Sequence, residues 1–206
     1  MIKKIVKSVL WAFIFILIAG ILSAGYFGFR LHRNFQNVQQ YSEIVEQELA
    51  AVGIAQYKDL ALAIIYTETK GRHNDLMQSS ESAHGEIGHV VTPQESVRLG
   101  IDFLAQAIEK SNQAGTDIWT AVQAYNFGLS YIDFVAKNGG TNTLELAKEY
   151  SRTVVAPSLG NTTGEMYRYL HPIAIVNNGG WLYLDGGNFF YAQIVEMNQR
   201  LFEIFK

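Results

Sequence analysis

The chain of 206 residues is long enough for one domain with a buried core, and it contains no cysteine. It can therefore form no disulfide, use no thiol nucleophile and carry no cysteine-linked lipid anchor. Residues 1–33 hold five of the 16 Lys and Arg and none of the 19 Asp and Glu, so the remaining residues carry a net charge of −8. This acidic balance argues against binding to nucleic acid, and against electrostatic capture of anionic polymers as the main mode of binding.

An uncharged apolar run occupies residues 9–29. It is long enough to cross a hydrocarbon layer of about 30 Å as a helix, whereas the apolar region of a cleaved signal peptide is usually only about 7–15 residues long. A cleaved peptide should also end in a small-x-small site, and Ser23-Ala24-Gly25 is a poor example of one. The run is therefore predicted to be a membrane anchor that is not cleaved.

The charges that flank this run predict its orientation. Three lysines precede it and two arginines follow it: Lys3, Lys4, Lys7, Arg30 and Arg33. Because positive residues tend to stay in the cytoplasm, the lysines favour a cytoplasmic N-terminus, and the arginines weaken that signal only a little. We expect residues 1–33 to form an anchor with a short cytoplasmic tail, and residues 34–206 to form one extracytoplasmic domain.

Apolar residues at helical spacing mark the next segments. Those of the first helix lie three and four positions apart: Phe35, Val38, Tyr41, Val45 and Leu49. Gly53 should end this helix. Residues 59–69 are apolar on all sides at their centre, which predicts a helix buried all round, and Gly71 lies where a C-terminal glycine is expected.

Residues 70–91 have no usable periodicity and are rich in Gly, Ser, His and Asn. A structureless loop of this length is usually functional, so we expect it to carry part of a site. The sequence Thr92-Pro93-Gln94-Glu95 predicts the start of the next helix, because it combines a capping Thr, a Pro in the first position and a Glu three residues after the cap. Its buried stripe should consist of Val97, Ile101, Leu104 and Ile108.

Further helices are expected at residues 117–127, closed by Gly128, from a capping Ser130 to Gly139-Gly140, and at residues 143–154, stopped by Pro157. A last helix should have one apolar face made of Phe190, Ile194, Met197, Leu201 and Phe205.

One β-hairpin interrupts this pattern. Residues 173–176 and 181–184 flank Asn177-Asn178-Gly179-Gly180 and are predicted to be its strands. The fold class is therefore mainly α, a helical bundle with one small hairpin, preceded by a single transmembrane helix.

Glu68 is the candidate general acid. It lies at the C-terminal end of the buried helix and is followed by a polar loop. A carboxylate in such a place should be poorly solvated, which raises its pKa toward the range in which it can donate a proton at neutral pH. The pattern alone also fits an ordinary solvated glutamate at a helix end.

Five motifs occur in a fixed order: Glu68-Thr69, Leu76-Met77-Gln78, a helix with the internal Gly100, Ala124-Tyr125-Asn126-Phe127-Gly128, and Tyr150-Ser151-Arg152-Thr153-Val154. Over roughly residues 40–205 this order resembles the lytic transglycosylase and goose-type lysozyme superfamily, and most closely the lysozyme-like domains of Gram-positive cell-wall hydrolases. The sequence departs from the family pattern at Asp75, where the family usually has Gly, and at Phe127, where it usually has a small residue.

The resemblance implies a lysozyme-like bundle that cuts peptidoglycan glycan strands, with Glu68 as the catalytic acid and no cofactor. It also implies a groove in which Gln78 and Ser80 give hydrogen bonds to the sugar and Met77 packs beneath it. The remaining substrate contacts implied are Ser79, Tyr125, Asn126 and Tyr150. The two tyrosines fit core packing as well.

The reaction outcome stays open. In lytic transglycosylases the muramyl 6-hydroxyl closes an anhydro ring and no second carboxylate is needed. Asp75 could instead position water and make the chain a muramidase, a hydrolase with two carboxyl groups. A third alternative is a catalytically inert module that binds glycan or a protein of cell-wall synthesis or division. In each case the domain is expected at the cell membrane, facing the wall.

Two further features have competing interpretations. Trp181, Tyr183, Tyr167 and Tyr169 could be sugar-stacking platforms, or the apolar face of the hairpin. The sequence from His84 to His89 resembles a zinc-protease motif, but its two histidines are five residues apart and separated by glycines. They cannot share one helical face, so no metal site is expected.

Overall fold

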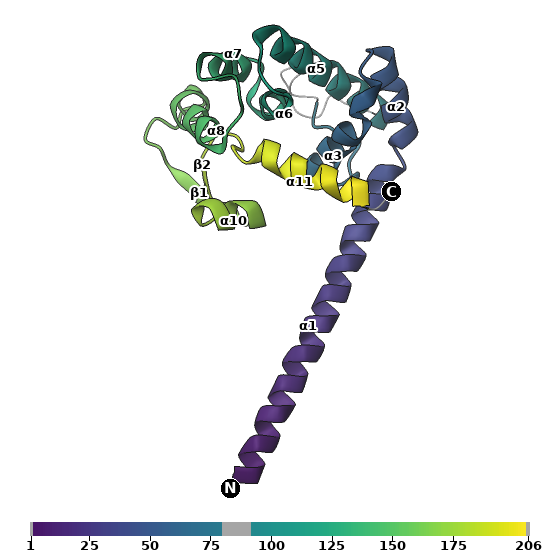
Figure 1. Cartoon of the computed structure of the whole chain (residues 1–206), viewed down its shortest axis with the longest axis vertical. Coiled ribbons are helices and arrows are strands. Elements are labelled where there is room, and N and C mark those ends of the chain that lie inside the picture. Colours follow the sequence, from purple (N-terminus) through teal and green to yellow (C-terminus); the bar gives the residue numbers. More distant parts are fainter. Residues whose placement is uncertain (1, 80–91, 205–206) are drawn as a thin grey trace.

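The computed structural model describes residues 2–79 and 92–204. A compact helical domain lies at one end of a long helix, α1 (Ile2–Gln39), whose N-terminal part projects away from it (Figure 1). The residues from Leu10 onward in α1 form a helix that is long and apolar enough to cross a membrane, and most of the large apolar side chains between Leu10 and Phe29 are exposed. The predicted apolar helix is therefore present, and the fold is mainly α as expected.

Within the described residues the domain consists of helices, of which α5 is the longest, and one pair of strands. In chain order they are α2 (Ser42–Ala51), η1 (Ala55–Tyr57), α3 (Lys58–Glu68), α5 (Pro93–Ala114), α6 (Ile118–Phe127), α7 (Ser130–Lys137), α8 (Leu144–Tyr150), η2 (Ser151–Val155), α9 (Ala156–Ser158), β1 (Met166–Arg168), α10 (Pro172–Asn178), β2 (Trp181–Tyr183) and α11 (Tyr191–Ile204).

Helix α3 lies at the centre of the core. Every residue from Leu60 to Tyr66 is buried, which confirms the expected helix without a solvent face. Helix α11 packs along it, while α1 and α2 cover other sides. Because α3 is held from several directions, the residue at its C-terminal end has a fixed position in the domain.

Helix α1 contributes to the same core. Phe35 and Val38 are buried, and the ring of Phe35 lies 4.8 Å from that of Phe202 in α11. The boundary expected between residues 33 and 34 lies inside α1, which continues as one helix to Gln39. The expected amphipathic helix is divided by a turn at Gln40 and Tyr41, after which α2 begins.

The start of α5 follows the sequence prediction. Thr92 accepts a hydrogen bond from the backbone N–H of Glu95 at 3.2 Å, and Pro93 occupies the first turn. The predicted stripe of Val97, Ile101, Leu104 and Ile108 is buried.

The hairpin prediction was wrong in its first strand. Strand β2 pairs antiparallel with β1, in the register Met166↔Tyr183, and residues 173–176 lie in helix α10. His171 Nδ1 accepts from the Ile173 N–H, Pro172 starts the helix, and Gly179 ends it with φ of 77°. These end signals outweigh the strand preference of the β-branched residues between them.

Helix α7 begins at Ser130, but the Ser130 side chain does not cap it, contrary to expectation. Pro157 likewise does not end the helix that precedes it. Ala156 N–H bonds to Ser151 O, five residues back, and this π turn is followed directly by α9, which contains the proline. Widening the helix just before a residue without an N–H allows the chain to continue.

The buried face of α11 is rotated from the one expected. Met197 is 37% exposed, whereas Val195, Asn198 and Phe202 are buried beside Ile194. Asn198 can lie inward because its Nδ2 donates to Thr67 Oγ1 at 2.9 Å. Phe205 lies outside the described residues.

Candidate active site

Glu68 is the last residue of α3, and its carboxyl group is mostly enclosed by the domain. The Tyr191 hydroxyl donates a hydrogen bond to Glu68 Oε1 at 2.5 Å. Burial raises the pKa of Glu68 above its ordinary value, the hydrogen bond from Tyr191 lowers it in part, and the charge of Asp75 raises it again. The net direction is upward, so the carboxyl holds its proton to a higher pH than a solvated glutamate does.

Tyr191 is held in place by side chains from helix α6. Gln123 of α6 donates to Asn188 O at 2.9 Å and accepts from the backbone N–H of Ala192 at 3.1 Å. Its amide therefore holds the chain on both sides of Tyr191. The tyrosine ring also stacks on that of Tyr125, with a centroid distance of 6.3 Å and an interplanar angle of 7°.

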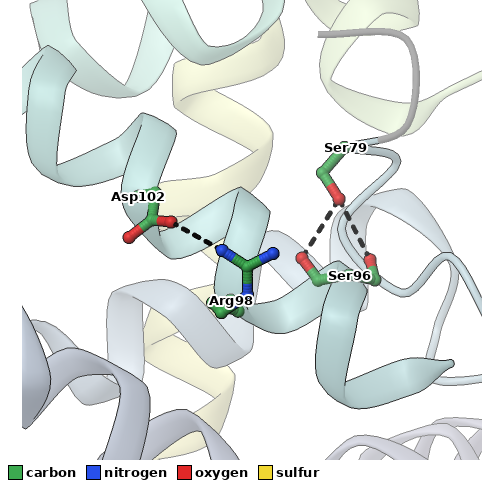
Figure 2. A network of polar contacts seen from close by, with 4 residues as sticks. All are labelled: Ser79, Ser96, Arg98 and Asp102. Atoms are coloured by element: carbon green, nitrogen blue, oxygen red, sulfur yellow. Dashed lines mark hydrogen bonds and ion pairs between the residues drawn. The ribbon is translucent and has the colours of Figure 1, made fainter. Parts of the chain in front are cut away.

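Asp75 is the acceptor at the centre of a buried polar network. Its Oδ1 accepts from Ser96 Oγ at 2.7 Å, from Ser79 N at 2.9 Å and from Ser79 Oγ at 3.3 Å. Figure 2 shows the two serines facing each other, with Ser79 Oγ directed at Ser96 Oγ and Ser96 O. Asp75 thus joins the loop after α3 to the first turn of α5, and its charge still acts on Glu68.

Figure 2 also shows that the ion pair between Arg98 and Asp102 lies further along α5. Both of these side chains are about half exposed, so this pair contributes little to stability.

Gly100 lies inside helix α5 at a point where neighbouring side chains leave no room for a Cβ. A Cβ at this position would lie 2.6 Å from Met77 Cβ and 2.8 Å from the Tyr125 hydroxyl. Tyr125 in turn donates to Met77 O at 2.9 Å. The Met77 side chain, expected beneath the groove, is fully buried and lies against Gly100 and Tyr125.

Glu68 opens onto a groove of about 690 Å³. Of the site residues predicted from the sequence, five line it: Glu68, Gln78, Tyr125, Asn126 and Tyr150. Tyr150 presents one side to the groove and packs the other in an aromatic cluster with Phe127, Tyr131 and Phe134. The groove and core interpretations of this tyrosine are therefore compatible.

Ser79 does not line the groove. It is 3% exposed and acts on the loop through Asp75 and Ser96, so its expected role as a direct sugar contact does not fit its position. Ser80 and the segment from His84 to His89 lie outside the described residues. Within residues 2–79 and 92–204, no three His, Asp or Glu residues are grouped in a way that could hold a metal ion.

Other groove residues were not anticipated. Part of the groove lining consists of apolar side chains around the π turn and α9: Val154, Val155 and Leu159, with Ser158 also lining it. Phe103 of α5 also lines the groove, stacked edge-on against Tyr125. The most important site residue that the sequence analysis did not predict is Tyr191, the hydrogen-bond partner of Glu68. It is 123 residues from Glu68 in sequence, so no local spacing connects the two.

None of the four aromatics considered as sugar platforms is among the residues that line this groove. Tyr183 is buried, and Tyr169 lines a second cavity, where it stacks on His171. Trp181 and Tyr167 do not line the groove either and remain partly exposed on the hairpin.

Comparison with known proteins places this geometry in a family. Residues 35–199 match the family model described as Lysozyme-like. A pneumococcal vaccine antigen A homolog from Streptococcus pyogenes is 49% identical over 179 residues, which cover 87% of this chain and 89% of that protein. The bifunctional muramidase/DL-endopeptidase CwlT of Bacillus subtilis is 35% identical over 115 residues, covering 56% of this chain and 34% of CwlT.

A solved structure agrees with the sequence relatives. The crystal structure of a protein similar to an NLP/P60-family lipoprotein, from Staphylococcus aureus, matches with a TM-score of 0.72 at 32% identity, over 80% of this chain and 52% of that one. The match of the family model over most of the chain, together with the enclosed acid at the end of α3, leads to one assignment: the chain belongs to the lysozyme-like family of cell-wall hydrolase domains.

Proposed function

We propose that this protein cuts the glycan strands of peptidoglycan at a muramyl glycosidic bond, with Glu68 as the general acid. The observation that carries the proposal is the enclosed carboxyl of Glu68, which opens onto a groove and whose pKa is raised by burial. A glycosidic bond breaks when its leaving oxygen receives a proton while positive charge develops at the sugar carbon. Glu68 supplies that proton, and its pKa direction favours the protonated form needed for the first step.

The second step is proposed to follow the lytic transglycosylase route. As the bond from the anomeric carbon to the leaving oxygen breaks, the muramyl 6-hydroxyl oxygen attacks the same carbon and gives its proton to Glu68. Asp75 fits a supporting role in this scheme, because Oδ1 is bonded to Ser79 and Ser96 and its charge acts on Glu68. The negative charge of Asp75 stabilises the positive charge that develops on the sugar in the transition state.

Hydrolysis is the second candidate. One observation favours it: part of the chain matches CwlT, whose name includes muramidase activity. In that case Asp75 would position or activate a water molecule, and the product would carry a reducing muramic end.

The proposed location is the cell membrane. Helix α1 is proposed to span it with residues 1–33 as the anchor, leaving residues 34–206 outside, against the wall. Protease added to intact protoplasts should then remove the domain, and full protection would contradict this orientation. Proteins of cell-wall synthesis or division are the partners that this location favours.

Mass spectrometry of products from purified peptidoglycan tests the function. Wild-type protein should release anhydro-muramyl ends, and reducing ends would support the muramidase instead.

Glu68→Gln keeps the shape of the side chain but carries no acidic proton, so cleavage should fall by about 10²–10⁴-fold while glycan binding persists. Tyr183→Phe, in the hairpin, is a control that should cleave normally. If a folded Glu68→Gln variant cleaves at the wild-type rate, or if wild type binds glycan without cleaving it, the assignment is wrong and an inert binding module takes its place.

A further inference from the structure

A second cavity, of about 390 Å³, lies where α1 leaves the domain. Helices α1, α3, α10 and α11 contribute to its walls, and its lining shares no residue with the glycan groove. Much of its lining is apolar: Phe27 and Leu31 come from α1, and Met197 and Leu201 come from α11. Met197 is partly exposed because α11 turns it toward this cavity and away from the core.

The charged residues that line this cavity are basic. Arg30 and Lys70 border it, together with His171, and none of its lining residues is Asp or Glu. Burial and the charge of Lys70 lower the pKa of His171, so the arginine and the lysine supply the positive charge. A ligand that matches this lining has an apolar part and an anionic group.

The surface beside the cavity is unusually apolar. Leu170 is 71% exposed, and Ile175 and Val176 of α10 are 48% and 85% exposed. Helix α10 contains no charged residue. Arg168 lies over the ring of Trp181 at 4.7 Å next to this helix, and tryptophan and arginine are side chains that suit the boundary between water and lipid.

The position of this surface along α1 indicates what it faces. The cavity includes Phe27 and Arg30, the positions at which the apolar run gives way to charge. Helix α10 lies on the side of the domain from which α1 projects (Figure 1). If α1 spans the membrane, the cavity and α10 therefore lie at the level of the outer lipid headgroups.

We propose that the cavity together with Leu170, Ile175 and Val176 forms a membrane-facing surface, and that the cavity takes an anionic phospholipid of the outer leaflet. The lipid phosphate lies between Arg30 and Lys70, an acyl chain packs on Phe27 and Leu31, and the exposed residues of α10 enter the interface. This holds the domain down on the bilayer. The inference rests on the proposed membrane span but is independent of the glycan chemistry.

The absence of cysteine permits a direct test on the full chain. Single nitroxide labels are attached at Val176→Cys, at Gln113→Cys on the exposed far end of α5, and at Ile18→Cys within α1. Each protein is reconstituted into phosphatidylcholine vesicles with or without phosphatidylglycerol. Collision of the label with oxygen, which concentrates in lipid, is compared with collision with a nickel chelate, which stays in water.

With phosphatidylglycerol present, the oxygen-to-nickel collision ratio at position 176 should rise several-fold above that at position 113. Arg30→Gln should reduce this rise, while Arg33→Gln, one turn along α1 and outside the cavity lining, should not. A water-exposed label at 176 overturns the docking when the label at 18 is deep in lipid, whereas a water-exposed label at 18 overturns the span itself. Equal immersion at 176 with and without phosphatidylglycerol overturns the anionic-lipid site.

Discussion

The hydroxyl of Tyr191 lies 2.5 Å from Oε1 of Glu68, so a residue at the start of the last helix sets the environment of the candidate acid. The ring stacks on Tyr125, whose own hydroxyl is bonded to Met77 O. Burial and the charge of Glu68 raise the pKa of both tyrosines, which remain protonated and can only donate toward these oxygens. The acid is thus held by the Tyr191 hydroxyl, and the ring of Tyr191 is in turn packed against Tyr125.

Removing that hydroxyl should move the pH profile of cleavage. The bond from Tyr191 lowers the pKa of Glu68, so Tyr191→Phe should raise this pKa further. Because a general acid must be protonated, the alkaline limb of the rate profile should shift to higher pH. The rate of glycan cleavage measured across pH checks this, with Tyr183→Phe as the matched control. An alkaline limb that stays in place would show that the bond does not act on the acid.

Glu68→Gln should stabilise the domain while it strongly lowers the rate of cleavage. Burial raises the folded-state pKa of Glu68 above its ordinary value, so the folded protein binds this proton more tightly than the unfolded chain. Its contribution to stability is present at low pH and is lost as pH rises through the folded pKa. Gln does not titrate, so near pH 7.5 the free energy of unfolding of the variant should exceed that of wild type by roughly 0.5–2 kcal/mol. This gap in stability should shrink toward pH 4.

Thermal melts at the two pH values measure this gap. Glu109→Gln, an exposed change on α5, should show no such difference between them. A gap that widens toward low pH would mean that the direction of the Glu68 shift is wrong.

Gly100→Ala should disturb the floor of the groove. The new methyl group would lie 2.6 Å from Met77 Cβ and 2.7 Å from its sulfur, so Met77 or the helix has to move. Overpacking of this kind costs about 1–3 kcal/mol, and displacement of Tyr125 should lower the cleavage rate as well. Thermal melting and product yield test both effects. Gln106→Ala, on the exposed side of the same helix, should leave the melting temperature and the product yield unchanged. If Gly100→Ala also leaves them unchanged, the contact with Met77 does not matter.

Asp75 can be tested for its structural and chemical roles separately. Asp75→Ala removes the acceptor of the bonds from Ser79 and Ser96, and the unpaired buried donors should cost about 1–3 kcal/mol. Asp75→Asn keeps an oxygen at Oδ1 and should fold normally. Circular dichroism, melting temperature and product masses should be measured for both variants.

For the asparagine variant, continued release of anhydro ends is expected, because the transglycosylase route uses the hydroxyl of the substrate. Loss of turnover in a folded Asp75→Asn would favour the hydrolase. An alanine variant as stable as wild type would show that the loop is held by other contacts.

The sequence correctly predicted those parts of the fold that are determined by residues close together in the chain. Thr92 and Pro93 start α5 as expected, and the apolar segment of α3 is buried all round because it has no polar side to expose. Glu68 could be proposed from its position at the end of that helix. The order of weak motifs then indicated Tyr125, Asn126 and Tyr150, which line the groove.

Two of the errors come from choices that depend on distant residues, and one comes from end signals that directly flank the segment. Asn198 turns inward only because Thr67 offers a partner from α3, and this rotates the buried face of α11. Residues 173–176 suit a strand by composition, yet Pro172 and Gly179 make them a helix. Tyr191 could not be linked to Glu68, since their contact exists only after α11 packs on α3.

The continuity of α1 limits where the proposed glycan cleavage can take place. A flexible linker would let the groove sample a volume that grows with linker length. Here the helix instead runs from the apolar segment into the core without a break, and the ten residues from Arg30 to Gln39 rise only about 15 Å. In the proposed topology the groove is therefore carried at a fixed height above the bilayer. Glycan strands next to the membrane are within reach of the groove and those further out in the wall are not, so the proposed cleavage would leave most of the wall intact.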